Sequence, residues 1–224
     1  HVSFSYDGKR DVLKEISFEV KNGQTIAFVG HTGSGKSSII NLFMRFYEFD
    51  RGQILIDGQD IKDYSQEALR KSIGLVLQEP FLYHGTIASN IRMYHEELTD
   101  EEIRQAAAFV DVADFIESLP GGYDHPVTER GSTLSTGQRQ LLAFARTIAA
   151  QPKILILDEA TANIDQETEE MIQNSLKKMR QGRTTIAIAH RLSTIQDADC
   201  IYVLDKGKII ESGNHDQLIA LGGT

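Results

Sequence analysis

The segment GHTGSGKS at residues 30–37 limits the possible folds of this chain more than any other feature. It follows the apolar run TIAFV at 25–29, and apolar residues at helical spacing begin just after Lys36. A glycine-rich loop between a buried strand and a helix turns backbone N–H groups inward, where they bind phosphate. The pattern G-x-x-x-x-G-K-S therefore predicts a phosphate-binding loop in an α/β fold.

Each part of this loop has a chemical reason. Lys36 is expected to reach the β- and γ-phosphate oxygens, and the Ser37 hydroxyl is a candidate Mg²⁺ ligand. A dinucleotide-binding fingerprint fails because Ser38 stands where a third glycine is needed, and no N-K-x-D guanine-reading segment occurs. ATP is therefore the predicted nucleotide. The residues of the loop expected to bind it are Gly30, His31, Thr32, Gly33, Ser34, Gly35, Lys36, Ser37 and Ser38.

Three further apolar runs end in polar side chains that suit nucleotide chemistry. In open α/β sheets, ligands lie beyond the carboxyl ends of the strands, so we expect these side chains to meet at one crevice. They are Asp158 and Glu159 after KILIL (153–157), His190 after TTIAIA (184–189), and Gln78 after IGLVL (73–77).

These side chains have distinct predicted roles. Asp158 is placed to hold Mg²⁺ through water, and Glu159 to orient or deprotonate the attacking water. His190 is predicted to sense the γ-phosphate, although a lone histidine is more often a packed or surface residue. Gln78 can offer its amide oxygen to Mg²⁺ or to the water.

The predicted fold is α/β, with a mixed and mainly parallel sheet around the phosphate loop. Alternation from Val2 and the run ISFEV at 16–20 predict an N-terminal antiparallel β subdomain, and ILI at 54–56 is read as another buried strand. Residues from about 79 to 138 lack strong strand patterns and are interpreted as an inserted α-helical subdomain. We expect all 224 residues to form one ATPase domain.

The charge and composition of the chain limit the kinds of partner that it can bind. The formal net charge of −9 argues against nucleic acid as a broad electrostatic partner. No run approaches the roughly 18 apolar residues that span a membrane. The chain starts abruptly at His1, inside a strand-like alternation, which indicates a part of something longer.

Together these residues resemble the nucleotide-binding domain of an ABC transporter, over essentially the whole chain. The loop at 30–37 matches the Walker A motif, Gln78 the Q-loop, ILILDEA at 154–160 the Walker B motif and His190 the switch histidine. LSTGQ at 134–138 stands for the family signature LSGGQ, and ANID at 162–165 for the D-loop with Asp165.

The resemblance extends to the exporter branch of the family. QEPFLYHGTIASNI at 78–91 and TERG at 128–131 are similar to exporter segments, with Glu129 as the implied contact to a membrane domain. This implies a membrane domain fused before residue 1, and a position at the cytoplasmic face of the cell membrane. Tyr6 is equally compatible with a core position by its spacing alone, and the resemblance assigns it to the adenine ring.

The resemblance also implies a mechanism for the LSTGQ segment. Ser135, Thr136, Gly137 and Gln138 would close on the γ-phosphate held by a second nucleotide-binding domain. Two ATP molecules would be bound between the domains, and the cycle of binding and hydrolysis would drive transport.

Thr136 departs from the family pattern, because it replaces the first signature glycine. Its Cβ would restrict the approach of the backbone to phosphate. Glu159 and His190 are intact, so the chain resembles one half of a heterodimeric multidrug exporter. Neutral drift in a homodimer is the alternative.

Two other functions are weighed against export. A soluble ABC ATPase acting on DNA or ribosomes would carry long coiled-coil insertions or tandem domains, and the acidic charge disfavours it. A nucleotide-gated scaffold without turnover is disfavoured by Glu159 and His190, and an assay for released phosphate separates it from an ATPase.

Overall fold

The computed structural model describes residues 1–128, 133–159 and 164–222, which fall into two compact units. The first unit contains residues 1–73, 153–159 and 183–224, and the second contains 74–152 and 160–182. The second unit is therefore larger than the helical subdomain expected at about 79–138. It also includes the two long helices on either side of residues 150–165, because the first packs on the shorter helices of the same unit and the second packs on the first.

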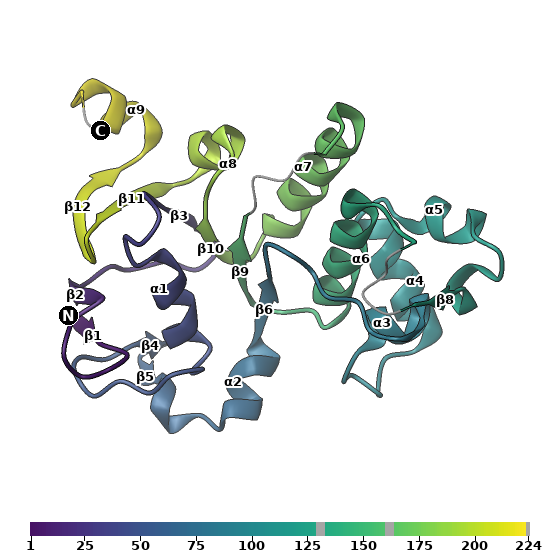
Figure 1. The fold of residues 1–224 in the computed structure, drawn as a ribbon, viewed down its shortest axis with the longest axis horizontal. Coiled ribbons are helices and arrows are strands. Elements are labelled where there is room, and N and C mark those ends of the chain that lie inside the picture. The colour runs from purple at the N-terminus through teal and green to yellow at the C-terminus, as the bar shows by residue number, and fades with distance from the viewer. Residues whose placement is uncertain (129–132, 160–163, 223–224) are drawn as a thin grey trace. The chain divides into compact units, whose positions relative to one another are not determined.

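A twisted sheet forms the centre of the first unit (Figure 1). Within this unit its strands lie in the order β12-β11-β3-β10-β9. The pairs β11/β3, β3/β10 and β10/β9 are parallel, and β11/β12 is antiparallel, so the expected mixed and mainly parallel sheet is confirmed. The strands are β3 (Thr25–Gly30), β9 (Ile154–Asp158), β10 (Thr184–Ile188), β11 (Cys200–Asp205) and β12 (Lys208–Gly213).

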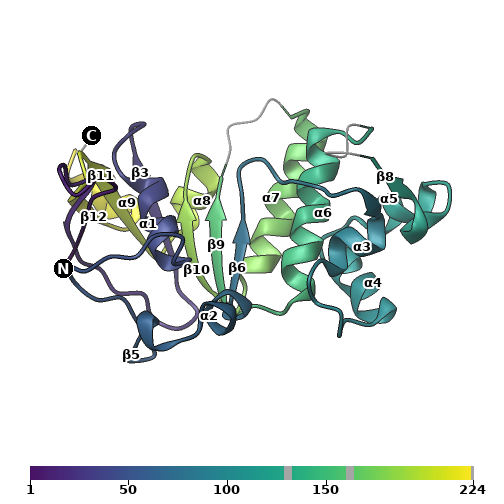
Figure 2. The ribbon, with the colours of Figure 1, turned by 60° about the horizontal axis from the view of Figure 1, so that its bottom comes forward.

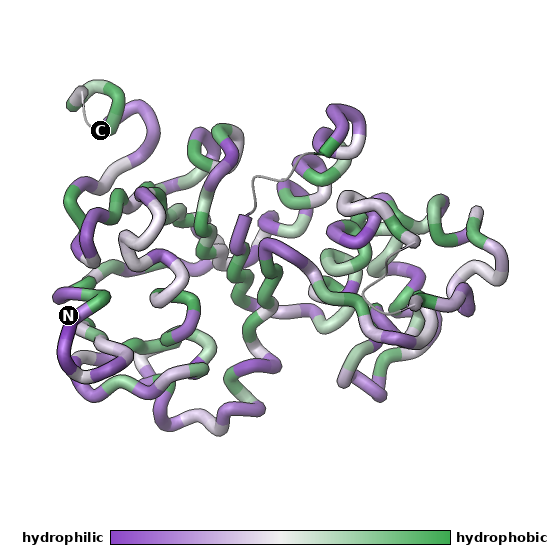
Figure 3. The backbone as a smooth tube through the Cα atoms, viewed as in Figure 1, coloured by the Kyte–Doolittle hydropathy of each residue, from purple (hydrophilic) through white to green (hydrophobic). Residues whose placement is uncertain are grey.

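The middle strands are buried on both faces, as their continuous apolar sequences predict. Ile26, Ala27 and Phe28 of β3 are fully buried, and Leu155 and Ile156 of β9 are too. Figure 3 shows these strands as hydrophobic stretches of the chain. Burial on both faces leaves the strand ends as the positions where polar side chains reach a ligand.

The N-terminal strands form a separate antiparallel pair, β1 (Val2–Phe4) with β2 (Leu13–Ile16). The expected strand at 16–20 is wrong, because only Ile16 of that run is in β2. Phe18 still points inward and contacts the rings of Phe28 and Tyr202. The alternation in ISFEV thus reflects which side chains pack inward, although residues 17–20 do not pair as a strand.

The run ILI is also corrected by the structure. Leu55–Ile56 form the short strand β4, which pairs antiparallel with β5 (Gln59–Asp60), and Leu55 is 53% exposed. Positive φ angles at Asp57 and Gly58 close this tight hairpin, so the run cannot continue into the buried sheet. The chain then passes through η1 (Ile61–Asp63), α2 (Gln66–Ser72) and β6 (Ile73–Val76).

Helices α1, α8 and α9 complete the first unit, and local signals explain their ends. Lys206 and Gly207 form the hairpin turn between β11 and β12, with positive φ at both residues. Asn214 caps α9, and its side chain accepts from the Gln217 N–H at 2.9 Å. These helices are α1 (Lys36–Phe43), α8 (Leu192–Asp197) and α9 (His215–Ala220).

The second unit is mainly helical, and α6 and α7 run side by side in it (Figure 2). Thr99 and Glu102 form a reciprocal capping box at the start of α4. Leu141, Phe144 and Ile148 form the buried face of α6, against which α3 and α4 pack. The elements are β7 (Gly85–Thr86), α3 (Ile87–Arg92), α4 (Asp100–Phe109), α5 (Ala113–Ser118), η2 (Gly122–Asp124), β8 (Pro126–Val127), α6 (Thr136–Ala149) and α7 (Gln166–Arg180).

The lengths of these helices bear on membrane insertion. Among residues 1–128, 133–159 and 164–222, none of the helices has the length and apolar character needed to cross a bilayer.

Candidate nucleotide-binding site

Strand register brings the predicted site residues of the first unit to one edge of the sheet. In the parallel ladders Ile188 lies opposite both Phe28 and Asp158. The ladder continues past the strand ends, because the Glu159 N–H donates to the Ile188 carbonyl at 3.1 Å. The phosphate loop after β3, the Asp158-Glu159 pair after β9 and His190 after β10 are therefore neighbours.

The phosphate loop has the backbone geometry that its glycines permit. Gly33 and Gly35 have φ angles of +80° and +110°, which residues with side chains rarely adopt. The Lys36 ammonium donates to the carbonyl of Gly30 and, at 3.4 Å, to that of His31. The loop thus wraps around the Lys36 ammonium at the start of α1.

Two opposing effects act on the Lys36 side chain. Burial lowers its pKa, and the nearby Asp158 carboxylate partly counters this by favouring the charged form. The predicted phosphate-binding cation and the predicted Mg²⁺ ligand therefore share one electrostatic environment.

The donor set of this loop fits a magnesium-bound nucleotide. The Ser34 hydroxyl is buried and has no hydrogen-bond partner within the described part of the chain, so it can donate to a phosphate oxygen. Ser37 is exposed at the first turn of α1, and Asp158 is half-buried at the end of β9. A hydroxyl and a carboxylate are oxygen ligands of the kind that Mg²⁺ prefers.

Tyr6 lies close to the phosphate loop. It is 47% exposed, and its hydroxyl hydrogen-bonds with that of Ser38 at 2.9 Å. The rings of Phe4 and Tyr47 hold it edge-on, each with its centroid 4.8 Å away. Of the two interpretations left open by the spacing, a fully buried core position is excluded, and a ring available to a nucleotide base remains.

Glu159 is almost entirely buried, with 4% of its surface exposed. The backbone N–H groups of His190 and Arg191 donate to its Oε2 at 3.1 and 3.3 Å. The Thr194 hydroxyl donates to Oε1 at 2.5 Å. The carboxylate is therefore held against the turn between β10 and α8, while the His190 side chain is exposed at the same turn.

The remaining predicted residues lie in the second unit. Gln78 is exposed just after β6. Ser135 caps α6 and forms a reciprocal box with Gln138, in which the Gln138 N–H donates to the Ser135 hydroxyl at 3.1 Å. The LSTGQ segment is thus the start of a helix of 14 residues, with its first backbone N–H groups at the helix N-terminus.

The structure separates the roles of positions 136 and 137. Thr136 is exposed, and its hydroxyl accepts from the Arg139 guanidinium at 3.4 Å. Gly137 is buried, and an added Cβ there would lie 2.1 Å from Cγ2 of Thr168 on α7. Packing within this unit therefore requires glycine at 137 and accepts threonine at 136.

Asp165 is the N-cap of α7, accepting from the Thr168 N–H at 2.9 Å. That N–H and then the Thr168 hydroxyl lower the pKa of Asp165. Thr168 therefore connects the D-loop aspartate with Gly137 of the LSTGQ segment. The earlier D-loop residues 162–163, and Glu129 of the TERG segment, lie outside the described residues.

The exporter-like segment is held by a half-buried arginine. Arg146 of α6 donates to the carbonyls of Phe81 and Asn90 at 2.9 and 2.8 Å, and burial lowers its pKa. Asn90 in turn accepts from the Tyr83 N–H at 2.7 Å. These bonds fix the backbone while the rings of Phe81 and Tyr83 stay 44% and 45% exposed.

Two contributors to the site escaped the sequence reasoning. Asn41 donates to the Tyr6 hydroxyl at 3.0 Å, and Thr194 donates to Glu159. Asn41 lies one turn after Ser37 on α1, so helical spacing offered a signal for it. The only signal for Thr194 was its place in the polar run after His190.

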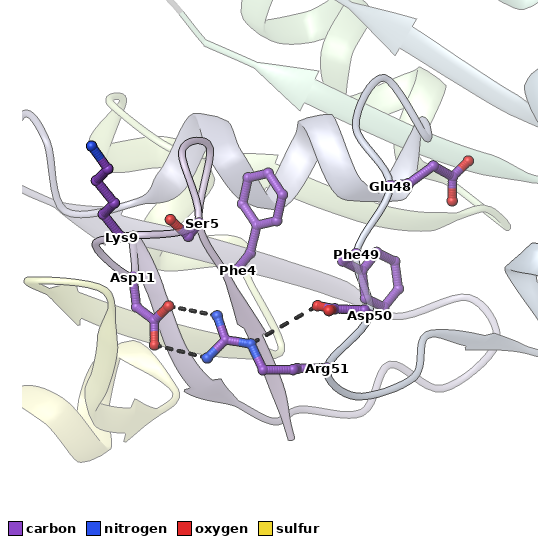
Figure 4. A pocket seen from close by; sticks show the side chains of 9 residues that line it. Phe4, Ser5, Lys9, Asp11, Glu48, Phe49, Asp50 and Arg51 are labelled. Atoms are coloured by element: carbon purple, nitrogen blue, oxygen red, sulfur yellow. Dashed lines mark hydrogen bonds and ion pairs between the residues drawn. The ribbon is translucent and has the colours of Figure 1, made fainter.

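A surface hollow of the first unit is lined by Phe4, which packs on Tyr6, and by none of the predicted nucleotide-binding side chains (Figure 4). Arg51 crosses it and pairs with both carboxylate oxygens of Asp11, at 2.5 and 3.1 Å. It is lined by Phe4, Ser5, Gly8, Lys9, Asp11, Glu48, Phe49, Asp50 and Arg51, none of which was predicted to bind nucleotide.

The fold and the site define an α/β domain of the phosphate-loop class. A family model described as ABC transporter matches residues 13–162. Over 224 residues, the chain is 75% identical to the "Putative ABC transporter ATP-binding protein exp8" of Streptococcus pneumoniae, covering 100% of this chain and 38% of the relative. Over 222 residues, it is 55% identical to the "Probable multidrug resistance ABC transporter ATP-binding/permease protein YheH" of Bacillus subtilis, covering 99% and 33%.

A solved structure agrees with these relatives. The chain matches one described as "Structure of a bacterial Atm1-family ABC exporter with ATP bound", with a TM-score of 0.91 and 46% identity over 99% of this chain and 39% of that chain. This chain belongs to the ABC transporter family. It spans between 33% and 39% of the length of these three relatives.

Proposed function

We propose that this chain binds and hydrolyses ATP to power export of a substrate across a membrane. The observation that carries the proposal is the convergence of the phosphate loop, the Asp158-Glu159 pair and His190 at the ends of three neighbouring strands. Phosphoryl transfer requires positioned charges and an oriented water more than covalent chemistry, and this edge of the sheet supplies such groups.

Each residue has a proposed role in that reaction. Lys36 compensates charge on the β- and γ-phosphates, and Tyr6 stacks on the adenine ring. Glu159 orients and deprotonates the attacking water, and His190 contacts the γ-phosphate. Mg²⁺ would neutralise phosphate charge when held by Ser37 and Asp158, and Gln78 is a further proposed ligand.

A second nucleotide-binding domain is the proposed partner. The exposed start of α6 presents Ser135, Thr136 and backbone N–H groups, which suit a phosphate held by another chain. Gly137, Gln138 and Asp165 support that surface from within the second unit. Binding of ATP would close the two domains together, and hydrolysis would open them.

A fused membrane domain is the other proposed partner, since YheH is named as an ATP-binding/permease protein. The chain would then act at the cytoplasmic face of the cell membrane. The exposed rings of Phe81 and Tyr83 sit on a backbone that Arg146 and Asn90 hold rigid, as an exporter-type contact surface requires.

The partner domain is proposed to be a different chain. Thr136 alters the surface offered to the partner's nucleotide, whereas Glu159 and His190 keep this chain's own site complete. The partner would carry an unaltered LSGGQ and lack the glutamate after its Walker B aspartate. Robust ATP turnover by the full-length protein purified without a second subunit would contradict the heterodimer.

The test of the ATPase proposal is Glu159→Gln in the full-length protein, with its partner present. The amide keeps the size of the side chain but cannot take a proton, so phosphate release should fall about 100-fold or more. ATP affinity should stay within twofold, and the closed dimer should accumulate. Glu19→Gln, at an exposed position of the same unit, is the matched control. Normal hydrolysis by Glu159→Gln would rule out the proposed base.

A further inference from the structure

We propose that Thr194 is a positioning residue that sets the orientation of the Glu159 carboxylate. This inference rests on the proposed role of Glu159 as the base. Thr194 lies in α8, four residues after His190, and is 35 residues from Glu159 in sequence. Strand pairing between β9 and β10 brings the two side chains together.

The contact is buried at both ends. Thr194 is 1% exposed and Glu159 is 4% exposed. A hydroxyl at that depth needs an acceptor, and a threonine in a helix often uses the carbonyl one turn earlier. Here the Thr194 hydroxyl instead donates to Oε1 of Glu159.

Thr194 holds the carboxylate oxygen that the two backbone N–H groups do not contact. The N–H groups of His190 and Arg191 both donate to Oε2 of Glu159. The terminal torsion of a glutamate side chain has broad minima, so contacts to one oxygen restrain the plane of the carboxylate only weakly. The hydroxyl of Thr194 donates to Oε1, and contacts to both oxygens define that plane.

The orientation of the Glu159 carboxylate plane affects the rate of ATP hydrolysis, because a base accepts a proton along the direction of its lone pairs. A glutamate side chain has rotamer freedom that must be lost before reaction, and a prior contact removes part of that requirement. The same turn carries His190, whose backbone N–H binds Glu159. Thr194 therefore keeps the proposed base and the proposed γ-phosphate sensor in a fixed relation.

The test is Thr194→Val, which keeps the branched shape and removes only the hydroxyl. In the full-length transporter with its partner, kcat for ATP hydrolysis should fall about tenfold or more, as expected for a misplaced catalytic group. KM for ATP should stay within twofold, because Thr194 has no proposed contact with the nucleotide. Thr194→Ser restores the hydroxyl and should return kcat to within threefold of the parent protein.

A matched control separates positioning from folding. Thr185→Val makes the same chemical change at a fully buried threonine of β10, whose hydroxyl bonds to the Arg183 carbonyl at 3.4 Å. This variant should keep kcat within twofold. Equal losses of kcat in Thr194→Val and Thr185→Val, a parallel rise in KM, or failure of Thr194→Ser to restore kcat would each overturn the proposal.

A parallel Glu159→Gln variant distinguishes this inference from the function on which it rests. Normal hydrolysis by Glu159→Gln would overturn the base assignment, and with it the role of Thr194. Loss of hydrolysis in Glu159→Gln, together with a kcat within twofold of normal or higher in Thr194→Val, would overturn the positioning role alone.

Discussion

Gly137→Ala is expected to destabilise the chain although alanine is the better helix former. Gly137 is the second residue of α6 and is buried against α7. The new Cβ would lie 2.1 Å from Cγ2 of Thr168, and carbon atoms in contact prefer about 3.5–4.0 Å. About 1.5 Å of movement is therefore needed between the two side chains.

Thr168 cannot easily supply that movement. It is β-branched, so its side chain has few rotamers, and its hydroxyl and N–H both bind Asp165. Forced overpacking of this kind costs about 1–3 kcal/mol. The preference of helices for alanine over glycine recovers up to about 1 kcal/mol. Because a 2.1 Å approach is severe, we place the cost in the upper part of that range, which leaves a net loss of about 1–2 kcal/mol in the free energy of unfolding.

Thermal unfolding of the purified chain, followed by circular dichroism, measures the effect. For a chain of this size the predicted loss corresponds to a fall in Tm of about 3–6 °C. Thr168→Ser removes Cγ2, so the double variant should recover most of the loss. Thr136→Ala, at the exposed neighbouring position, should stay within about 0.5 kcal/mol of the parent.

An unchanged or raised Tm in Gly137→Ala would refute the steric reasoning. If ATP turnover were then lost while Tm stayed constant, glycine at 137 would be needed for approach to phosphate and not for packing on Thr168. Additive effects of Gly137→Ala and Thr168→Ser would refute it as well, because side chains that clash must show coupling.

Two further predictions follow from the charges of the site. Lys36→Ala should weaken ATP binding about tenfold or more, because it removes charge-assisted bonds to phosphate. Calorimetric titration measures the ATP affinity, and Lys9→Ala, at an exposed position, is the control. Unchanged affinity in Lys36→Ala would contradict the phosphate-loop assignment. Asp165→Ala should lower Tm at pH 7 but much less near pH 3. The folded-state pKa of Asp165 is lowered from 3.8, so the charge of Asp165 stabilises the folded state above pH 3.8. This stabilisation is lost as the pH falls through the folded-state pKa. An equal Tm difference at both pH values would show that the charge of the cap is irrelevant.

Features that depend on neighbours along the chain could be predicted from the sequence. The phosphate loop, the caps at Thr99 and Asn214 and the turn at Lys206 all involve residues within a few positions of each other. Their geometry follows from local backbone preferences and short side-chain reach. The order of the buried apolar runs likewise identified the strands of the parallel sheet.

The hydrophobic pattern gave wrong strand predictions where an apolar run does not pair as a strand of the buried sheet. ISFEV alternates correctly for burial, yet the partner strand β1 begins at Val2, opposite Ile16, so pairing stops there. ILI is apolar enough for the core, yet a two-residue turn commits it to an exposed hairpin. Hydrophobic periodicity reports which side chains are covered and does not name the strand that covers them.

The order of residues along the chain was enough to identify a phosphate loop, an acidic pair, a histidine and a helix start, in an order that marks the family. How these groups are held could be read only from the folded chain. Thr194 reaches Glu159, Tyr6 reaches Ser38 and Thr168 reaches Gly137 across 35, 32 and 31 positions of sequence. Such contacts depend on strand register and helix packing, which arise from the whole core and leave no signal in the spacing of the residues themselves.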